Sequence, residues 1–391
     1  MSINHLVSKK IVDIPKSAIH EMTRLSKQVE DVAFLSWAKP TSGTPPHIIR
    51  AAVEAAEAGK TGGYSETAGL EILREKITDK LRRDNNIQAT PGEILVTVGA
   101  IEGLAAAVLA IVDPGDEVLI PVPGYSTHIR QVVLASGKPV LVPTYAEEDF
   151  RLDPDRLKNA VTPKTKAILF SSPNNPVGSV YSEEDLRAVA EIALAHDLVV
   201  ITDEAYEYFV YDGLRHFSIG SIEGMRERTI SCFTFTKTYA MTGWRIGYLH
   251  ASPDWIFQIT KTHIPFAICA PVISQYAALA ALTGPQDCVE EFRTHYQKMR
   301  DVMCERLARM PDLFSFTKPS GSYLMFPKVE TEEGKDSMAF AKKLLQDVKV
   351  STTPGIAFKG EGHVRMSFCV PEDTIHKAFD RMEDYFGRNR G

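Results

Sequence analysis

The chain has 391 residues, of which 44% are hydrophobic and 24% charged, as expected for a globular protein long enough for two or three domains. Its formal net charge of −6 gives no support for a basic nucleic-acid-binding face. Five scattered cysteines without a C-x-x-C pair argue against a disulfide framework or zinc ribbon, and no histidine pair has metal-binding spacing, so no metal is expected.

The N-terminal sequence MSINHLVSKK contains no apolar core of signal-peptide length. The most apolar stretch, residues 94–112, is interrupted by Gly99, Glu102 and Gly103. This pattern predicts a strand followed by a buried helix rather than a membrane span. We therefore expect a cytoplasmic protein that binds neither a membrane nor nucleic acid.

Short apolar runs alternate with helical patterns through the first two thirds of the chain. Several runs are continuous, which is typical of strands covered on both faces in a mainly parallel sheet. The predicted strands are residues 94–98, 118–122, 140–143, 167–171, 198–202, 230–236 and 245–250. One helix is expected to begin after Ser182, a hydroxyl cap followed by three acidic residues. The alternation predicts an α/β domain over residues 46–280.

The last third of the chain has a different pattern. Residues 288–310 predict a long charged helix, and shorter elements follow, with turns expected at 319–322 and 353–355. We interpret residues 281–391, together with 1–45, as a second and smaller α+β domain.

Four segments carry residue types suited to chemistry. Three lie at or just beyond the ends of predicted strands: residues 171–178 (SSPNNPVG), 202–206 (TDEAY) and 234–245 (TFTKTYAMTGWR). The carboxyl ends of parallel strands share one edge of a sheet, where ligands bind. The fourth segment, residues 362–367 (GHVRMS), belongs to the C-terminal part. Taken singly, each has a plain structural explanation as a turn, a helix cap or a surface charge.

Together, in this order, the segments resemble the class I and II aminotransferases of fold type I, which are pyridoxal phosphate (PLP) enzymes. The resemblance extends from about residue 14 to 385. Its most specific motif is K-x-x-x-M-T-G-W-R-I-G-Y, in which Lys237 precedes Arg245 by eight residues. It implies a large domain with a mainly parallel seven-stranded sheet between helices, and a smaller α+β domain.

The resemblance implies that Lys237 forms a Schiff base with the cofactor, because only a primary amine gives an imine that a substrate amine can displace. The same amine would move the proton between the substrate Cα and the cofactor. Asp203 would face the pyridine nitrogen and keep it protonated. Asn175 and Tyr206 would hydrogen-bond the ring oxygen, and Tyr125 would stack on the ring.

The cofactor phosphate is expected at the start of a helix that follows the first predicted strand, because backbone N–H groups there suit an anion. The resemblance assigns the phosphate to Gly99, Ala100, Ile101, Thr234, Thr236 and Arg245. Tyr64 matches a tyrosine that reaches the phosphate from the neighbouring subunit. This match implies a homodimer with shared active sites.

Arg365 matches the arginine that clamps the substrate α-carboxylate, since a planar guanidinium makes two parallel bonds to it. Asn175 is expected beside it. The sequence departs from the family at residues 36–41 (SWAKPT), where a glycine-containing stretch is usual. Ala38 places a methyl group in the expected substrate pocket, and Trp37 narrows it.

Two further residues are candidates for meeting an acidic substrate side chain, namely Lys39 and His128. A solvated surface charge is the alternative for Lys39. The sequence does not identify the amino donor or the oxo-acid acceptor.

The resemblance predicts an aminotransferase that moves an amino group from an L-amino acid to a 2-oxo acid by a ping-pong mechanism. A PLP-dependent lyase, cyclase or oxidase is the alternative, motivated by the altered stretch at Trp37 and Ala38. A non-catalytic regulator with an added DNA-binding domain finds little support, because only about 45 residues precede the α/β domain.

Overall fold

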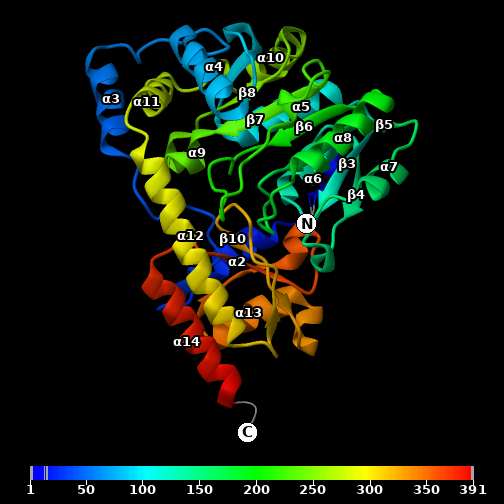
Figure 1. The fold of residues 1–391 in the computed structure, drawn as a ribbon, viewed down its shortest axis with the longest axis vertical. Coiled ribbons are helices and arrows are strands. Elements are labelled where there is room, and N and C mark those ends of the chain that lie inside the picture. Colours follow the sequence, from blue (N-terminus) through cyan, green and yellow to red (C-terminus); the bar gives the residue numbers. More distant parts are fainter. Residues whose placement is uncertain (1–2, 13, 15, 389–391) are drawn as a thin grey trace.

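A computed structural model of the protein describes residues 3–12, 14 and 16–388. Its largest sheet has seven strands in the order β2-β8-β7-β6-β5-β3-β4 (Figure 1). Every strand is parallel to its neighbours except β8, which is antiparallel to β2 and β7. The strands are β2 (Ile94–Thr97), β3 (Glu117–Val122), β4 (Lys138–Pro143), β5 (Thr165–Ser171), β6 (Val199–Asp203), β7 (Thr229–Thr234) and β8 (Gly247–His250).

The continuous apolar runs predicted these strands because the sheet is covered on both faces. Every residue of β2, β3, β6, β7 and β8 is buried, whereas the edge strand β4 is largely accessible. Two predicted boundaries are wrong. Phe235 and Thr236 belong to a short helix, because the Thr234 hydroxyl accepts a hydrogen bond from the Thr236 N–H and caps it. Arg245 has a left-handed φ of 52°, so β8 begins only at Gly247.

Helices cover the two faces of the sheet. Helix α5 packs on β7, β8 and α10. A Cβ at Gly103 in α5 would lie 3.2 Å from the side chains of Leu249 and Thr97, so glycine permits this close approach. Ser182 caps α8 as predicted. These helices are α3 (Pro46–Glu57), α4 (Glu71–Asn85), α5 (Gly99–Ile111), α6 (Ser126–Leu134), α7 (Pro154–Asn159), α8 (Glu183–Ala195), α9 (Phe235–Thr238), α10 (Pro253–Ala267) and α11 (Val272–Thr283).

The later part of the N-terminal segment, with α2 and β1, lies with the C-terminal third, whereas α1 contacts α6 of the large sheet's covering helices (Figure 1). Strand β1 (Ala33–Phe34) pairs with β12 (Val350–Ser351), and α12 packs against α14. The predicted charged helix is α12. The remaining elements are α1 (Lys9–Val12), α2 (Ala18–Ser26), α12 (Asp287–Ala308), α13 (Ser337–Asp347), α14 (Glu372–Arg388), β9 (Phe314–Ser315), β10 (Leu324–Met325), β11 (Lys328–Val329), β13 (Thr353–Pro354) and β14 (Val364–Ser367).

The turn predicted at residues 353–355 is wrong in part. Thr353 and Pro354 form the two-residue strand β13, which pairs with β14 through Thr353 and Arg365. Only from Gly355 does the chain turn, into a 3-10 helix. The antiparallel strands β10, β14 and β13 thus hold Arg365 in a fixed register.

The small sheets lie against the carboxyl edge of the seven-stranded sheet. The Gly321 N–H donates to the carbonyl of Gly178 at 2.8 Å, which joins the loop after β5 to the C-terminal third. The carboxyl ends of β2, β3, β5, β6 and β7 meet at this same edge. Within residues 3–12, 14 and 16–388, no helix is long and apolar enough to span a membrane.

Candidate active site

A cavity of about 450 Å³ opens at the carboxyl edge of the large sheet. Most of the residues predicted from the sequence line it, although they come from distant parts of the chain. The predicted residues in its wall are Trp37, Ala38, Lys39, Ala100, Ile101, Tyr125, Asn175, Asp203, Tyr206, Thr234, Thr236, Lys237, Arg245 and Arg365.

Lys237 lies in α9, directly after β7, and its half-buried side chain lines this cavity. Its Nζ donates to the carbonyl of Ala38 at 2.8 Å and lies 5.5 Å from the ring centres of both Tyr206 and Tyr323. Burial lowers the pKa of the Lys237 amine to about 8, and the positive charge of Arg365 acts in the same direction. A lysine in such a place is readily deprotonated and can act as a nucleophile or a base.

Asp203 ends β6 and presents its carboxylate to the cavity from the sheet edge. Its Oδ2 lies 3.2 Å from Nε2 of His128, which is buried behind it in α6. The His128 ring meets Tyr125 edge-on at 5.5 Å. His128 therefore supports Asp203 and does not line the cavity, so it does not fit the role of meeting a substrate side chain.

Tyr206 follows Asp203 by three residues and is buried against Tyr323, with ring centres 5.0 Å apart. Burial raises the pKa of the Tyr206 hydroxyl above its ordinary value, so it stays protonated and can donate a hydrogen bond at neutral pH.

Arg365 reaches the cavity from β14, and its guanidinium is buried. Its Nη1 donates to Oδ1 of Asn175 at 3.1 Å, and its Nη2 donates to the carbonyl of Ser36 at 2.9 Å. Burial lowers the pKa of this guanidinium from its usual value. Nε is buried without a hydrogen-bond partner among the residues that the structure describes. The group therefore keeps an unused donor, as an anion-binding arginine would.

A second cationic group lies where α5 begins. Gly99 has a φ of +75°, and a Cβ there would be 2.6 Å from Nη2 of Arg245. The helix N-terminus and this guanidinium therefore face one another across a space that only glycine leaves open. Thr234 and Thr236 lie beside it, with their hydroxyl oxygens 2.9 Å apart. Gly99 itself does not line the cavity, although Ala100 and Ile101 do.

The departing stretch after β1 contributes its backbone as well as its side chains. The carbonyl of Ala38 accepts hydrogen bonds from Lys237 and, at 3.0 Å, from the Tyr323 hydroxyl. Trp37 is 41% exposed and packs on Phe34 with ring centres 4.6 Å apart. Its indole therefore forms part of the cavity mouth, as expected from its position.

Tyr64, like Gly99 and the candidate His128, does not line the cavity. Its side chain is 82% exposed.

Several cavity residues escaped prediction. Ile19 and Thr23 come from α2, more than 200 residues before Lys237, and their amphipathic helix carries no chemical signature. The others have small side chains and lie near predicted residues in the sequence. That nearness is the only feature of the sequence that could have indicated them. These residues are Ser36, Ser171, Ala205 and Thr242.

The residues present fit pyridoxal phosphate. The cavity offers a half-buried amine with one hydrogen-bond partner, a carboxylate at a strand end, and a helix N-terminus opposed by a guanidinium. Arg365 adds an unpartnered buried donor for a second anion, such as a substrate carboxylate. This combination of an amine, an acid and two anion-binding groups is what a phosphorylated aldehyde and an amino acid require together.

Comparisons with known proteins agree with this chemistry. Residues 31–382 match the family model of aminotransferase class I and II. The chain is 42% identical to an aspartate aminotransferase of Pyrococcus abyssi, covering 96% of this chain and 97% of that one. It is 39% identical to aromatic-amino-acid aminotransferase 2 of Thermococcus litoralis, with the same coverage.

A solved structure of the aromatic aminotransferase from Pyrococcus horikoshii superposes with a TM-score of 0.89 at 40% identity, covering 94% of this chain and 99% of that one. The sequence similarity and the structural similarity therefore extend over nearly the whole chain. The chain belongs to the class I and II aminotransferase family and is a pyridoxal phosphate-dependent aminotransferase.

Proposed function

We propose that Lys237 is the amine that attaches the cofactor and then moves the proton at the substrate Cα. The observation that carries this role is the partly desolvated Nζ, whose pKa is lowered to about 8 and which lies in the same cavity as Asp203 and Arg365. Bound pyridoxal phosphate supplies a ring that withdraws electrons from the substrate Cα. Because a neutral amine is needed to accept the Cα proton, a pKa near the working pH suits both halves of the reaction.

In this proposal the surrounding residues bind the ring and the phosphate of the cofactor. Asp203, supported by His128, keeps a proton on the ring nitrogen, and Tyr206 and Asn175 donate hydrogen bonds to the ring oxygen. Tyr125 covers one face of the ring. The phosphate is held by the start of α5 and the side chains of Thr234, Thr236 and Arg245.

Arg365 binds the α-carboxylate of the amino acid and of the oxo acid, which orients the Cα–H bond toward Lys237. Its buried guanidinium and free Nε support this role. Since one site binds both substrates in turn, the two half-reactions follow a ping-pong order.

The cavity wall supports donors with apolar or aromatic side chains. Ile19, Trp37 and Ile101 form an apolar side of the mouth, and Ile101 and Trp37 are 46% and 41% exposed. Lys39 is exposed at the same mouth and would meet an acidic side chain at its rim. Relatives named for aspartate and for aromatic amino acids support both classes. The altered stretch thus fits a substrate preference, and no observation favours a lyase, cyclase or oxidase.

We further propose a homodimer with shared active sites, in which Tyr64 contacts the phosphate bound by the partner subunit. Large exposed apolar side chains on α3, at the end of α10 and at the start of α11 offer an interface. They are Ile49, Val53, Ile264, Phe266, Ile268 and Ile273. Sedimentation should give a dimer mass, and Tyr64→Phe should weaken cofactor binding. A monomer with full activity would contradict this assembly.

The chain is also proposed to divide into a large domain over residues 46–280 and a small domain made of 1–45 and 281–391. The cytoplasm stays a prediction from the sequence alone.

Lys237→Ala is the direct test of the proposed mechanism. The variant should still bind the cofactor through the phosphate and ring contacts but lose roughly 10⁴-fold or more of the turnover, because both the attachment and the proton transfer are removed. Cofactor content is measured by absorption and turnover by oxo-acid formation. Near-normal turnover would remove Lys237 from its assigned role.

A further inference from the structure

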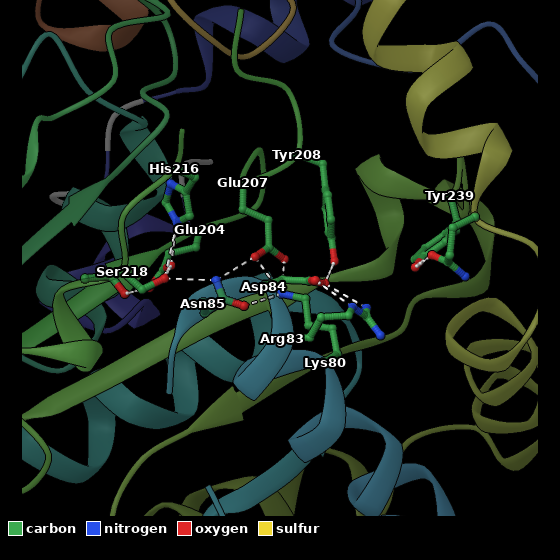
Figure 2. Close-up of polar contacts among 12 residues, drawn as sticks. Lys80, Arg83, Asp84, Asn85, Glu204, Glu207, Tyr208, His216, Ser218 and Tyr239 are labelled. Carbon is green, nitrogen blue, oxygen red and sulfur yellow. Dashed lines mark hydrogen bonds and ion pairs between the residues drawn. The ribbon is translucent and has the colours of Figure 1, made fainter. Parts of the chain in front are cut away.

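Two carboxylates alternate with the cavity residues in the segment after β6. Asp203 and Tyr206 line the cavity, whereas Glu204 and Glu207 are buried outside it. Glu207 contacts α4, and Glu204 contacts His216 and Ser218 (Figure 2). The Glu207 N–H donates to the Glu204 carbonyl at 3.1 Å, which closes a turn around Tyr206. Any movement of Glu204 or Glu207 therefore moves Tyr206 as well.

A buried ion pair anchors one end of this turn. Nζ of Lys80, in the last turns of α4, lies 2.6 and 2.5 Å from the two carboxylate oxygens of Glu207. The third donor of the ammonium group goes to Oδ1 of Asn85 at 2.7 Å. The side chains of Lys80 and Glu207 are 4% and 7% exposed, so water does not compete for these bonds. All three ammonium protons have an acceptor, which fixes the position of the Glu207 carboxylate.

Asn85 links this ion pair to the other end of the turn. Its Nδ2 lies 2.8 Å from Oε2 of Glu207 and 2.9 Å from the Ser218 hydroxyl, which in turn donates to Glu204 at 2.5 Å. His216 approaches the same Glu204 oxygen to 2.7 Å. Both carboxylates thus belong to one connected network (Figure 2).

The charge state of Glu204 fits this network. Burial alone would raise the pKa of Glu204, but the hydrogen bonds from His216, Ser218 and Thr202 outweigh it and lower the pKa. Glu204 is therefore ionised at neutral pH and accepts these hydrogen bonds as a carboxylate.

Stability does not explain why so many polar groups are buried here. A buried ion pair is often no more stabilising than apolar side chains of the same volume, because both charges lose their water. What such a pair can supply is a unique geometry. The geometry fixed here is that of the turn that carries Tyr206 and begins at Asp203.

We propose that Lys80, Asn85 and Glu207 are positioning residues for the reaction, which hold the 203–207 turn so that Tyr206 and Asp203 meet the cofactor ring correctly. This inference rests on the roles proposed above for Tyr206 and Asp203. The three residues do not line the cavity and act only through the turn.

The test uses the holoenzyme of the double variant Lys80→Met/Glu207→Met, which removes both charges at similar volume and is therefore expected to fold. The visible absorption of the bound cofactor is titrated against pH. We expect its midpoint to shift by about one pH unit, the size of one misaligned charge-assisted hydrogen bond. We also expect kcat to fall about tenfold while KM for the amino donor changes less than about threefold, because Arg365 is not disturbed.

Two controls separate positioning from general stability. Arg306→Met breaks the ion pairs that the buried Arg306 of α12 makes with the more exposed Asp380 and Glu383 of α14, away from the cavity, and should leave the absorption midpoint unchanged. Hydrogen exchange of the 203–209 amides in cofactor-free protein should accelerate in the double variant and not in Arg306→Met. If the double variant does not fold, Glu207→Gln, which keeps the shape of the side chain, takes its place and should also move the midpoint away from the wild-type value; an unchanged midpoint would overturn the positioning role.

Tyr206→Phe separates the proposed role of Tyr206 at the cofactor from the positioning role of Lys80, Asn85 and Glu207. If Tyr206→Phe moves the midpoint and the network variants behave like Arg306→Met, the positioning role is wrong and the proposed function stands. If Tyr206→Phe leaves the midpoint unchanged, the role of Tyr206 and the positioning role both fail.

Discussion

The protein holds two lysines away from bulk solvent in opposite surroundings, Lys80 fully buried and Lys237 half-buried. Nζ of Lys80 has both carboxylate oxygens of Glu207 and the amide oxygen of Asn85 within 2.7 Å. Nζ of Lys237 donates to one backbone carbonyl, that of Ala38, and has no carboxylate in ion-pair distance among the described residues. The difference teaches that the partners of a lysine, rather than burial alone, decide its role. An ammonium group paired with a carboxylate holds structure, whereas one without a carboxylate partner can lose its proton and react.

The same contrast applies to the buried arginines. Arg300 contacts Asp212, Asp301 and the carbonyl of Pro319, and it joins α12 to two loops. Arg365 has neutral partners only and keeps a free Nε. Arg365 therefore fits its proposed role in binding a carboxylate, whereas Arg300 already has acidic partners and holds structure.

Of the two buried arginines, the poorly paired one should have the larger effect on catalysis when it is changed. Arg365→Lys should lower kcat/KM for amino donors by about 30-fold to several thousand-fold, corresponding to roughly 2–5 kcal/mol, because one ammonium group cannot replace the bidentate contact. Steady-state kinetics measures the loss. The cofactor absorption serves as the control and should not change. An unaltered KM and kcat would mean that the carboxylate binds elsewhere.

The two lysines should respond oppositely to the same substitution. Lys80→Met leaves Glu207 buried and unpaired and should destabilise the protein by about 3–5 kcal/mol, whereas Lys237→Met removes a desolvated amine and should leave stability unchanged or raise it. Urea unfolding of the cofactor-free proteins compares them. Equal destabilisation by both substitutions would refute the contrast.

The pH dependence of stability should carry the signature of Lys237. Its pKa is about 8 in the folded chain against an ordinary value of 10.5, so between these pH values the unfolded chain binds the extra proton. The free energy of unfolding of the cofactor-free protein should therefore rise from pH 8 to 10.5 by up to roughly 3 kcal/mol, and fall again as pH drops toward 8. Lys237→Met should abolish this rise. A rise that persists in Lys237→Met would assign it to other groups.

The smallest effect is expected at the rim of the cavity. Lys39 is exposed, and an exposed ion pair contributes about 0–1 kcal/mol, so Lys39→Ala should lower kcat/KM for acidic donors by no more than about fivefold. Aromatic donors should be unaffected. Equal kinetics for acidic donors in both proteins would remove Lys39 from substrate recognition.

The large sheet could be predicted from the sequence because its strands, apart from the accessible edge strand β4, are local apolar runs buried on both faces. The small sheets could not, because strands of two residues, such as β1 and β13, exist only through pairing with partners that lie 317 and 12 residues away along the chain. The predicted end of β7 and the predicted start of β8 are wrong because apolarity alone does not mark either boundary. The Thr234 side chain caps a helix and so ends β7, and the left-handed Arg245 delays the start of β8.

The site was predictable where a motif places several reactive groups at strand ends. Lys237, Asp203 and Arg365 are brought to one cavity as expected. Ile19 and Thr23 were not predicted, because an amphipathic helix looks the same whether it covers a core or a substrate. The support of Asp203 by His128 and the Lys80–Glu207 network are contacts across 75 and 127 residues of sequence, which no spacing encodes.

The most direct test of this account mixes the purified holoenzyme with single amino acids in the absence of any oxo acid. Wild-type protein should release one equivalent of 2-oxo acid per subunit and then stop, fastest with apolar and aromatic donors, because the amino group stays on the enzyme until an acceptor arrives. Lys237→Ala should release almost none on the same timescale. Continuous product formation without an acceptor, or release of ammonia, would contradict the proposed transfer and the role of Lys237 in it.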